Sequence, residues 1–295
     1  MKTLNYIQLG ATFFVPATHK NLKDIINIKK YPQLKSIVID TEDGINNTEL
    51  TKALQIIQTL LINFTPNNLL IFIRPRNPST LKALLSFKNI STIDGFVLPK
   101  FSLKNANEYL RLVKNKPYYI MPSIEDSDLF DSSKLIELKN LLQESQTNVM
   151  LVRFGLEDML RQLTLTRKCS QSLFDLCATS SVIGQFIGIF KSAGFAISGG
   201  VYPCFKDNIG FEKDALRDLQ EGLFSKTIIH PNQIQPLHEL YKVSKQEYND
   251  ALEIIQSKKA VFNQHGKMAE TSTQTIYSQY IIKRAEIYGL KEIFM

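Results

Sequence analysis

The sequence predicts an α/β fold, a (β/α)8 TIM barrel followed by a C-terminal helical extension. Eight short apolar runs alternate with longer amphipathic stretches along most of the chain. Short, continuous apolar runs are typical of parallel strands buried on both faces. The length of 295 residues, 44% of them hydrophobic, suits one such barrel. A doubly wound open sheet is the alternative, but it often carries a Gly-rich phosphate turn after its first strand, where this chain reads VPATHKN.

The predicted strands are apolar runs that end next to polar or charged residues. They cover residues 11–16, 35–40, 69–75, 95–100, 117–125, 148–155, 194–202 and 226–230. Stretches with helical periodicity lie between them, over residues 21–30, 48–63, 79–87, 105–114, 132–144, 172–193 and 211–222. A closing helix in HPNQIQPLHELY completes a catalytic barrel domain over residues 1–241.

The tail, residues 242–295, predicts two further helices over 245–262 and 273–288, with Gly266 marking the loop between them. This extension is too short for an ordinary independent domain. We expect it to pack on the barrel or on a neighbouring subunit.

Composition narrows the class of protein. The longest apolar stretches are short and interrupted by polar residues or glycine, and the N-terminus lacks the apolar core of a secretory signal. We therefore expect a cytoplasmic protein with no membrane partner. The net charge is +7 and the pI is about 9.1, but the lysines are scattered, so we expect no nucleic-acid partner. A small anionic substrate suits this charge equally well.

The three cysteines, Cys169, Cys177 and Cys204, form no CxxC or Cys/His metal pattern. Their odd number argues against a disulfide framework. Free thiols are the expectation.

Two acidic residues directly follow strand-like runs: Glu125 in PSIED and Asp158 in RFGLED. In a TIM barrel the carboxyl ends of all strands form one face, where active sites lie. Two carboxylates from adjacent strands, completed by water and substrate oxygens, are a usual arrangement for Mg²⁺. The spacing alone also fits a solvated loop at Glu125 and a helix N-terminus stabilised by Asp158.

An acidic cluster and two basic residues occupy equivalent strand ends. Asp40, Glu42 and Asp43 in DTEDG need a compensating cation, arginine or water, or form an ordinary solvated turn. Arg74 follows LLIFI, where its planar fork suits a substrate carboxylate or an internal ion pair with that acidic cluster. Lys100 suits an anionic substrate group, with Schiff-base chemistry as the weaker alternative.

These residues, in this order, resemble the HpcH/HpaI aldolase and citrate lyase β-subunit family, metal-dependent C–C bond lyases on a TIM barrel. The matching segments are FVPA at 14–17, DTEDGI at 40–45, FIRPRN around Arg74, GFVLPK at 95–100, Glu125 in PSIED, Asp158 in FGLED, ISGGVY at 197–202 and KTIIHPNQI at 226–234. No single motif is diagnostic, but the ordered set is highly specific.

Three departures stand out. Gly10-Ala11 replace the family's Arg-Ser, Arg76 stands where an asparagine is usual, and Glu270 replaces a C-terminal aspartate that can reach a neighbour's active site. The chain is thereby similar to the divergent branch named C–C bond lyase of the TIM-barrel fold. These departures leave CoA binding and citryl specificity open.

The resemblance implies a carbon–carbon lyase or aldolase that acts on a 2-keto or 3-hydroxy carboxylic acid or its acyl-CoA thioester. Glu125 and Asp158 would hold Mg²⁺, with Mn²⁺ as an alternative ion. Arg74, Lys100 and Pro16 would bind substrate.

The resemblance also assigns proton handling to Glu42, Asp43 and Glu270, with Glu270 acting in cis or from a neighbouring subunit, and Arg74 as a further catalytic residue. We expect a homo-oligomer, with a trimer as one option. Two other functions stay open: a biosynthetic C–C bond enzyme on a non-CoA substrate, and a metal-binding homologue without turnover.

Overall fold

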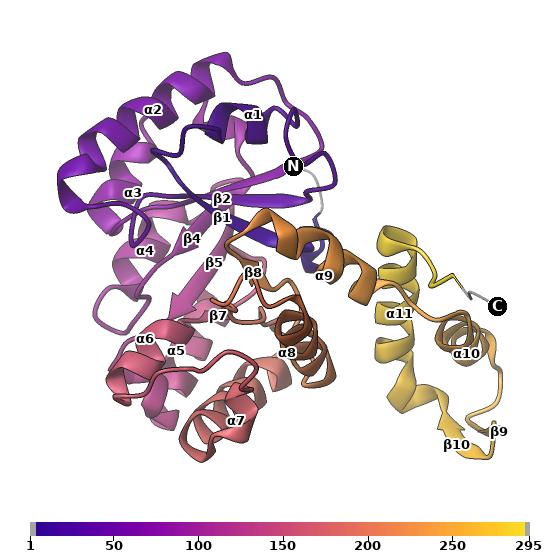
Figure 1. Ribbon diagram of the computed structural model, residues 1–295. Coiled ribbons are helices and arrows are strands. Elements are labelled where there is room, and N and C mark those ends of the chain that lie inside the picture. Colours follow the sequence, from indigo (N-terminus) through magenta and orange to yellow (C-terminus); the bar gives the residue numbers. More distant parts are fainter. Residues whose placement is uncertain (1–3, 293–295) are drawn as a thin grey trace. The chain divides into compact units, whose positions relative to one another are not determined.

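The computed structural model describes residues 4–292 and separates into two compact units, Met1–Ile234 and Gln235–Met295. The first unit contains the parallel sheet and its covering helices (Figure 1). The second contains helices and a small hairpin. Each unit is described by itself below.

The first unit is built on parallel strands that follow the predicted order. Their bounds are β1 Thr12–Pro16, β2 Ser36–Asp40, β3 Leu70–Arg74, β4 Gly95–Leu98, β5 Tyr119–Ile124, β6 Asn148–Val149, β7 Arg153–Phe154 and β8 Thr227–Ile228. Neighbours run in the order β6, β5, β4, β3, β2, β1, β8, and β7 also pairs with β5. Consecutive parallel strands joined by helices are the topology of the predicted barrel.

The seventh predicted strand is not a regular strand, which corrects that detail of the prediction. The segment carries two successive glycines and a proline in SGGVYP, and glycine weakens a strand interior. Backbone hydrogen bonds nevertheless pass through it: Val152 N donates to the Ala196 carbonyl (2.8 Å) and Ser198 N to the Val152 carbonyl (3.1 Å). Thr227 N donates to the Gly199 carbonyl (3.2 Å), and β8 pairs with β1. The ring of strands is therefore closed by an irregular seventh segment.

Helices surround these strands (Figure 1). They are α1 Leu22–Ile26, α2 Leu50–Asn63, α3 Pro78–Leu84, α4 Ala106–Val113, α5 Ser132–Glu144, α6 Leu156–Gln162, α7 Cys177–Ser192 and α8 Asn208–Gln220. The helix α9 Ile234–Tyr241 begins at the boundary between the two units. The short helix α6 directly follows β7; it is absent from the predicted helical ranges, although a helix start at Asp158 was one of the alternatives left open. It is the element that carries Asp158.

The interior of the strand ring is apolar. Val38, Phe72, Val97, Met121 and Leu151 form a buried cluster, each from a different strand or predicted strand. Every second residue of a strand points to the same face, so this core follows from the alternation within each apolar run.

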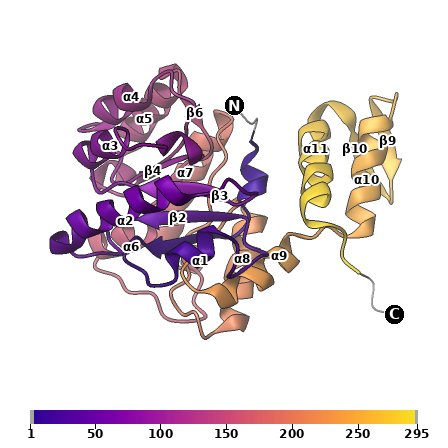
Figure 2. The same ribbon diagram turned by 90° about the horizontal axis from the view of Figure 1, so that it is seen from above.

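The second unit has α10 Lys245–Gln256, α11 Thr271–Tyr288 and a hairpin of β9 Val261–Gln264 and β10 Lys267–Glu270. The two helices lie side by side in both views (Figures 1 and 2). The first predicted tail helix therefore ends six residues early, because the chain turns into a strand. His265 and Gly266 both have positive φ angles (51° and 78°), as a tight two-residue hairpin turn requires.

The expectation of three free thiols is wrong. Cys169 and Cys204 form a disulfide, whereas Cys177 is free and exposed. The two cysteines lie in loops 35 residues apart that the fold brings together, and spacing in the sequence does not show this proximity.

A buried ion cluster fixes the same region. Lys226, 1% exposed in its side chain, contacts Asp214 (2.6 Å) and Asp218 (2.5 Å) of α8. Arg167 also pairs with Asp214 and lies over the Tyr202 ring. Lys226 of the KTIIH segment is thus a structural residue.

Within residues 4–292, none of the helices is both long and apolar enough to cross a bilayer.

Candidate active site

A cavity of about 500 Å³ opens where the parallel strands end. Five of the residues predicted from the sequence line it: Pro16, Asp43, Arg74, Glu125 and Asp158. The size is in the usual range for small-molecule sites. The strand-end rule therefore brings most of the predicted residues to one cavity.

Glu125 is a buried acid of this cavity, with 3% of the residue exposed. Its carboxylate accepts hydrogen bonds from the Lys100 backbone N–H (2.6 Å) and the Ser123 hydroxyl (3.0 Å). Lys100 has a positive φ of 48°, a conformation that directs this N–H to the carboxylate. Burial raises the pKa of Glu125, and the charge of Asp158 raises it further, against the lowering effects of the Lys100 N–H and Arg74.

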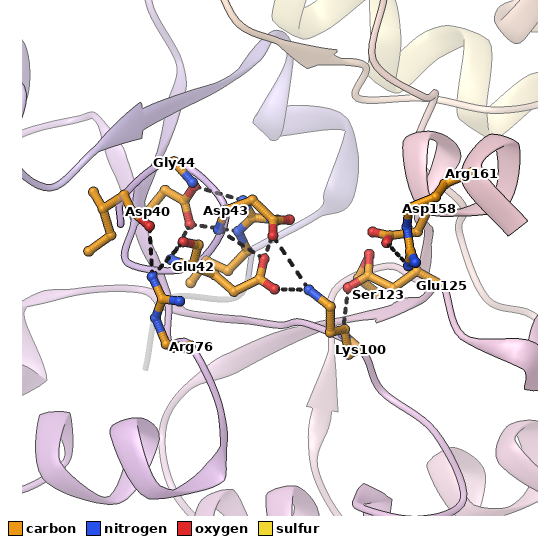
Figure 3. A network of polar contacts seen from close by, with 12 residues as sticks. Asp40, Glu42, Asp43, Gly44, Arg76, Lys100, Ser123, Glu125, Asp158 and Arg161 are labelled. Atoms are coloured by element: carbon orange, nitrogen blue, oxygen red, sulfur yellow. Dashed lines mark hydrogen bonds and ion pairs between the residues drawn. The ribbon is translucent and has the colours of Figure 1, made fainter. Parts of the chain in front are cut away.

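Asp158 reaches the same cavity from the first turn of α6. β7 pairs in parallel with β5, with Ile124 opposite Phe154, so the chain segments that follow the two strands start beside each other. The Asp158 carboxylate is paired with Arg161 one turn along the helix, at 2.6 Å (Figure 3). The Arg161 side chain is 67% exposed, which leaves it free to move aside.

Gly155 makes room for the Glu125 side chain. A Cβ added to Gly155 would lie 2.1 Å from the Glu125 Cβ and 2.3 Å from its Oε2. Only glycine therefore permits Glu125 to occupy its place beside the start of α6.

The carboxylates of this cavity suit a divalent cation that takes its remaining ligands from water and substrate. Glu125 is a buried carboxylate with a raised pKa, and across residues 4–292 no basic side chain forms an ion pair with it. No group of three or more His, Cys, Asp or Glu side chains in that span is arranged to hold a metal ion. Two carboxylates plus water and substrate oxygens is a coordination typical of Mg²⁺.

Arg74 is held by the acidic cluster that follows β2. Its Nε and Nη2 donate to the two oxygens of Asp40, each at 2.7 Å, because strand pairing places Arg74 opposite Asp40. Its Nη1 contacts Glu42 (3.0 Å) and Asp43 (3.5 Å). The internal ion pair, one of the two roles open from the sequence, is therefore present.

Lys100 belongs to the same cluster and does not line the cavity. Its ammonium points to Glu42 and Asp43 (Figure 3). Burial lowers the pKa of Lys100, but its hydrogen bond to Glu42 and the nearby carboxylates raise it to about 12. A permanently charged amine is a poor Schiff-base nucleophile. Burial also raises the pKa of Glu42, although Arg74 and Lys100 oppose that shift.

Arg153 is a cavity residue that the sequence analysis missed. It lies on β7, is 3% exposed, and lies over the Phe14 ring at 5.1 Å. It donates to the Thr227 hydroxyl and approaches the Met121 sulfur (3.7 Å). Burial and the charge of Arg74 lower the pKa of Arg153 to about 9, which still leaves it charged at neutral pH. An arginine inside the apolar run NVMLVRFG was the available clue.

Glu270 is the one predicted site residue outside the first unit. It ends β10 and accepts a hydrogen bond from the Ser272 hydroxyl (2.9 Å). Its role stays a prediction.

Comparison with known proteins identifies the family. A family model described as C–C bond lyase of the TIM-barrel fold matches residues 3–290. The chain belongs to this family. The fold class and the enzyme class predicted from the motifs, a carbon–carbon lyase on a TIM barrel, are thus confirmed.

Named proteins from two organisms are similar in sequence to this chain. The human mitochondrial citramalyl-CoA lyase is 25% identical over 303 residues, which cover 95% of this chain and 84% of that protein. The β subunit of citrate lyase from Escherichia coli K12 is 27% identical over 150 residues. That match covers 48% of this chain and only 47% of the E. coli protein, about half its length.

Solved structures share the fold of this chain. A citrate lyase from Burkholderia xenovorans LB400 superposes with a TM-score of 0.76 at 16% identity, covering 96% of this chain and 93% of that one. The protein CitE from Mycobacterium tuberculosis, in complex with magnesium, acetoacetate and coenzyme A, gives a TM-score of 0.70 at 16% identity, covering 95% and 99%.

Proposed function

We propose that this protein is a Mg²⁺-dependent lyase or aldolase that cleaves or forms a carbon–carbon bond in a 2-keto or 3-hydroxy carboxylic acid or its acyl-CoA thioester. The observation that carries the proposal is the pair of carboxylates, Glu125 and Asp158, that face one cavity at the strand ends. The magnesium, acetoacetate and coenzyme A complex of the structural neighbour supports the same class of ligand.

Glu125 and Asp158 would hold the ion, with Mn²⁺ as an alternative. When bound, Mg²⁺ supplies a Lewis acid that offsets the negative charge developing on a substrate carbonyl oxygen. The hydrogen bonds from Ser123 and the Lys100 backbone fix the Glu125 carboxylate, so little reorganisation is needed at that position.

The Arg74 cluster would orient the substrate and handle the proton. Asp40 holds Arg74 in a fixed plane at the cavity edge, and Pro16 lies level with Asp40 on the neighbouring strand. Glu42 and Asp43 share the cations Arg74 and Lys100. A buried carboxylate with a raised pKa, such as Glu42, is suited to accept a proton near neutral pH. Glu270 is proposed as the acid on the carbon side, in cis or from a neighbouring subunit.

The metal site is tested by Glu125→Gln and Asp158→Asn, measured by titration calorimetry with MgCl₂. Each change removes one charged ligand, and we expect a loss of Mg²⁺ affinity of at least about tenfold. Arg111→Gln, an exposed change on α4, serves as the control. Unchanged affinity in both carboxylate variants would remove the metal site from this proposal.

The acyl partner needs a separate assay. The citramalyl-CoA lyase relative supports a CoA thioester, whereas the Gly10-Ala11 and Arg76 departures support a free acid. Cleavage of CoA thioesters and of free keto acids, measured in parallel, separates these substrates. A protein that binds Mg²⁺ but cleaves neither would support the non-catalytic alternative.

We also propose a homo-oligomer, with a trimer as one option. Ile276 and Tyr277 on α11 are 80% and 60% exposed, and Met268 on β10 is 69% exposed. Large exposed apolar side chains mark contact surfaces when they gather on one element.

A further inference from the structure

Arg153 forms part of the floor of the cavity. Strand pairing sets Arg153 opposite Ser123, two residues before the level of Glu125. Its guanidinium lies over Phe14 and beside Thr227 and Met121, and each of these three residues precedes the carboxyl end of its strand. Because a strand rises about 3.3 Å per residue, this floor lies deeper in the barrel than the carboxylates at the strand ends.

Arg153 differs from the other basic residues near the cavity in the charged groups that surround it. Arg74 and Lys100 face three carboxylates, those of Asp40, Glu42 and Asp43. Arg153, by contrast, forms no ion pair among residues 4–292. Its hydrogen bonds and its ring contact are to neutral groups, and the charge of Glu125 acts on it only from beyond ion-pair distance. A buried charge without a partner is costly, so such residues commonly meet a ligand of opposite charge.

Thr227 adds a hydroxyl group beside the Arg153 guanidinium. Its hydroxyl accepts from Arg153 Nη2, which leaves its own proton to donate, and Thr227 lines the same cavity. A planar guanidinium and a hydroxyl suit the oxygens of a carboxylate. The Phe14 ring covers one face of the guanidinium, so an anion approaches through the N–H edge.

We propose that Arg153 and Thr227 bind a second, distal carboxylate of the substrate, and that the substrate is therefore a 2-oxo or hydroxy dicarboxylic acid unit. This inference rests on the proposed function, in which the other end of the substrate lies at Glu125 and Asp158. Arg153, rather than the acid-bound Arg74, is then the main carboxylate anchor.

The test compares ligands that differ only in the distal group. Titration calorimetry in MgCl₂ measures the affinity of oxaloacetate against 2-oxobutyrate, and of 2-oxoglutarate against 2-oxopentanoate. We expect the wild-type protein to bind at least one dicarboxylate about 10- to 100-fold more tightly than its partner, the range for a hydrogen bond to a charged group. Arg153→Gln should remove this preference while leaving monocarboxylate affinity nearly unchanged.

Arg111→Gln is the matched control, because it removes the same charge from an exposed position on α4 and should keep the preference. Thr227→Val, nearly isosteric, is the second variant and should reduce the preference about threefold to tenfold. If the circular dichroism melt shows that Arg153→Gln does not fold, the result with Thr227→Val decides the test.

Two results overturn the inference: no dicarboxylate preference in the wild-type protein, or a preference that survives in both variants. These leave the proposed function intact if 2-oxo acids still bind in a Mg²⁺-dependent way. Absence of Mg²⁺-dependent binding of all four acids overturns the proposed function as well.

Discussion

At the scale of single residues, Gly155 is expected to control the metal site although it offers no ligand. In Gly155→Ala the new methyl group would displace Glu125, since it would lie within 2.3 Å of that side chain. Displaced supporting groups typically cost about 10- to 100-fold in metal affinity. We expect a loss of this size in Mg²⁺ titrations, with the fold retained in circular dichroism.

Gly184→Ala is the control for this change. Gly184 lies within α7, and a Cβ there meets no atom within 4 Å. Alanine favours a helix over glycine by about 0.5–1 kcal/mol, so this variant should be slightly more stable with normal Mg²⁺ affinity. Equal Mg²⁺ affinity in both glycine variants would mean that Glu125 is not held as described.

Single residues also show which parts of the site the sequence predicts. Glu125 and Asp158 were predictable because polar groups that follow apolar strands share one face of a barrel. The partners of Arg74 stayed open, since the sequence does not reveal that strand pairing sets it opposite Asp40. Arg153 was missed because it lies inside an apolar run, where a strand-end rule does not look.

At the scale of elements, the disulfide is expected to stabilise the loops beside the cavity. Cys169 lies beyond α6, and Cys204 lies one residue after Pro203, which lines the cavity. Cross-links of this kind typically stabilise by about 2–4 kcal/mol. We expect the double change Cys169→Ser and Cys204→Ser to lower the free energy of unfolding by that amount in urea titrations.

The free cysteine supplies the control. Cys177→Ser changes an exposed thiol and should leave the free energy of unfolding within about 0.5 kcal/mol of the wild-type value. A reducing agent should destabilise the wild-type protein and not the double variant. If the reductant has no effect on the wild type, the two thiols are not joined in solution.

The elements also mark the limits of prediction from sequence. The strand order and seven of the eight predicted strand segments follow from apolar runs, whereas the seventh in sequence lacks regular pairing in a segment with two glycines and a proline. The β9–β10 hairpin was predicted as a helix end and a loop, because VFNQ and KMAE have little alternation of apolar and polar residues. His265-Gly266 at its turn was the available indication.

At the scale of the whole molecule, the chain combines a barrel that holds the predicted metal ligands with a smaller unit that holds Glu270. The order of eight motifs along the sequence predicted the fold and the family, because seven of these motifs lie at or beside strands of one parallel sheet and the seventh lies in the irregular segment that closes it. A single sequence carries no comparable pattern that reveals how subunits assemble into an oligomer. The contribution of Glu270 to catalysis is therefore best measured on assembled subunits.

Co-assembly of two inactive variants tests whether Glu270 acts on a neighbouring subunit. Glu125→Gln and Glu270→Gln are each expected to be inactive, since the first lacks a metal ligand and the second lacks the proposed acid. If one subunit supplies Glu125 and its neighbour Glu270, random co-assembly restores about a quarter of the sites in a cyclic oligomer. We expect co-expressed variants to recover lyase activity near that level.

Glu125→Gln mixed with Asp158→Asn is the matched control, because both ligands belong to one barrel and mixing leaves every site without one of them. Recovery only in the first mixture would assign Glu270 to the neighbouring subunit, whereas no recovery in either would exclude that role.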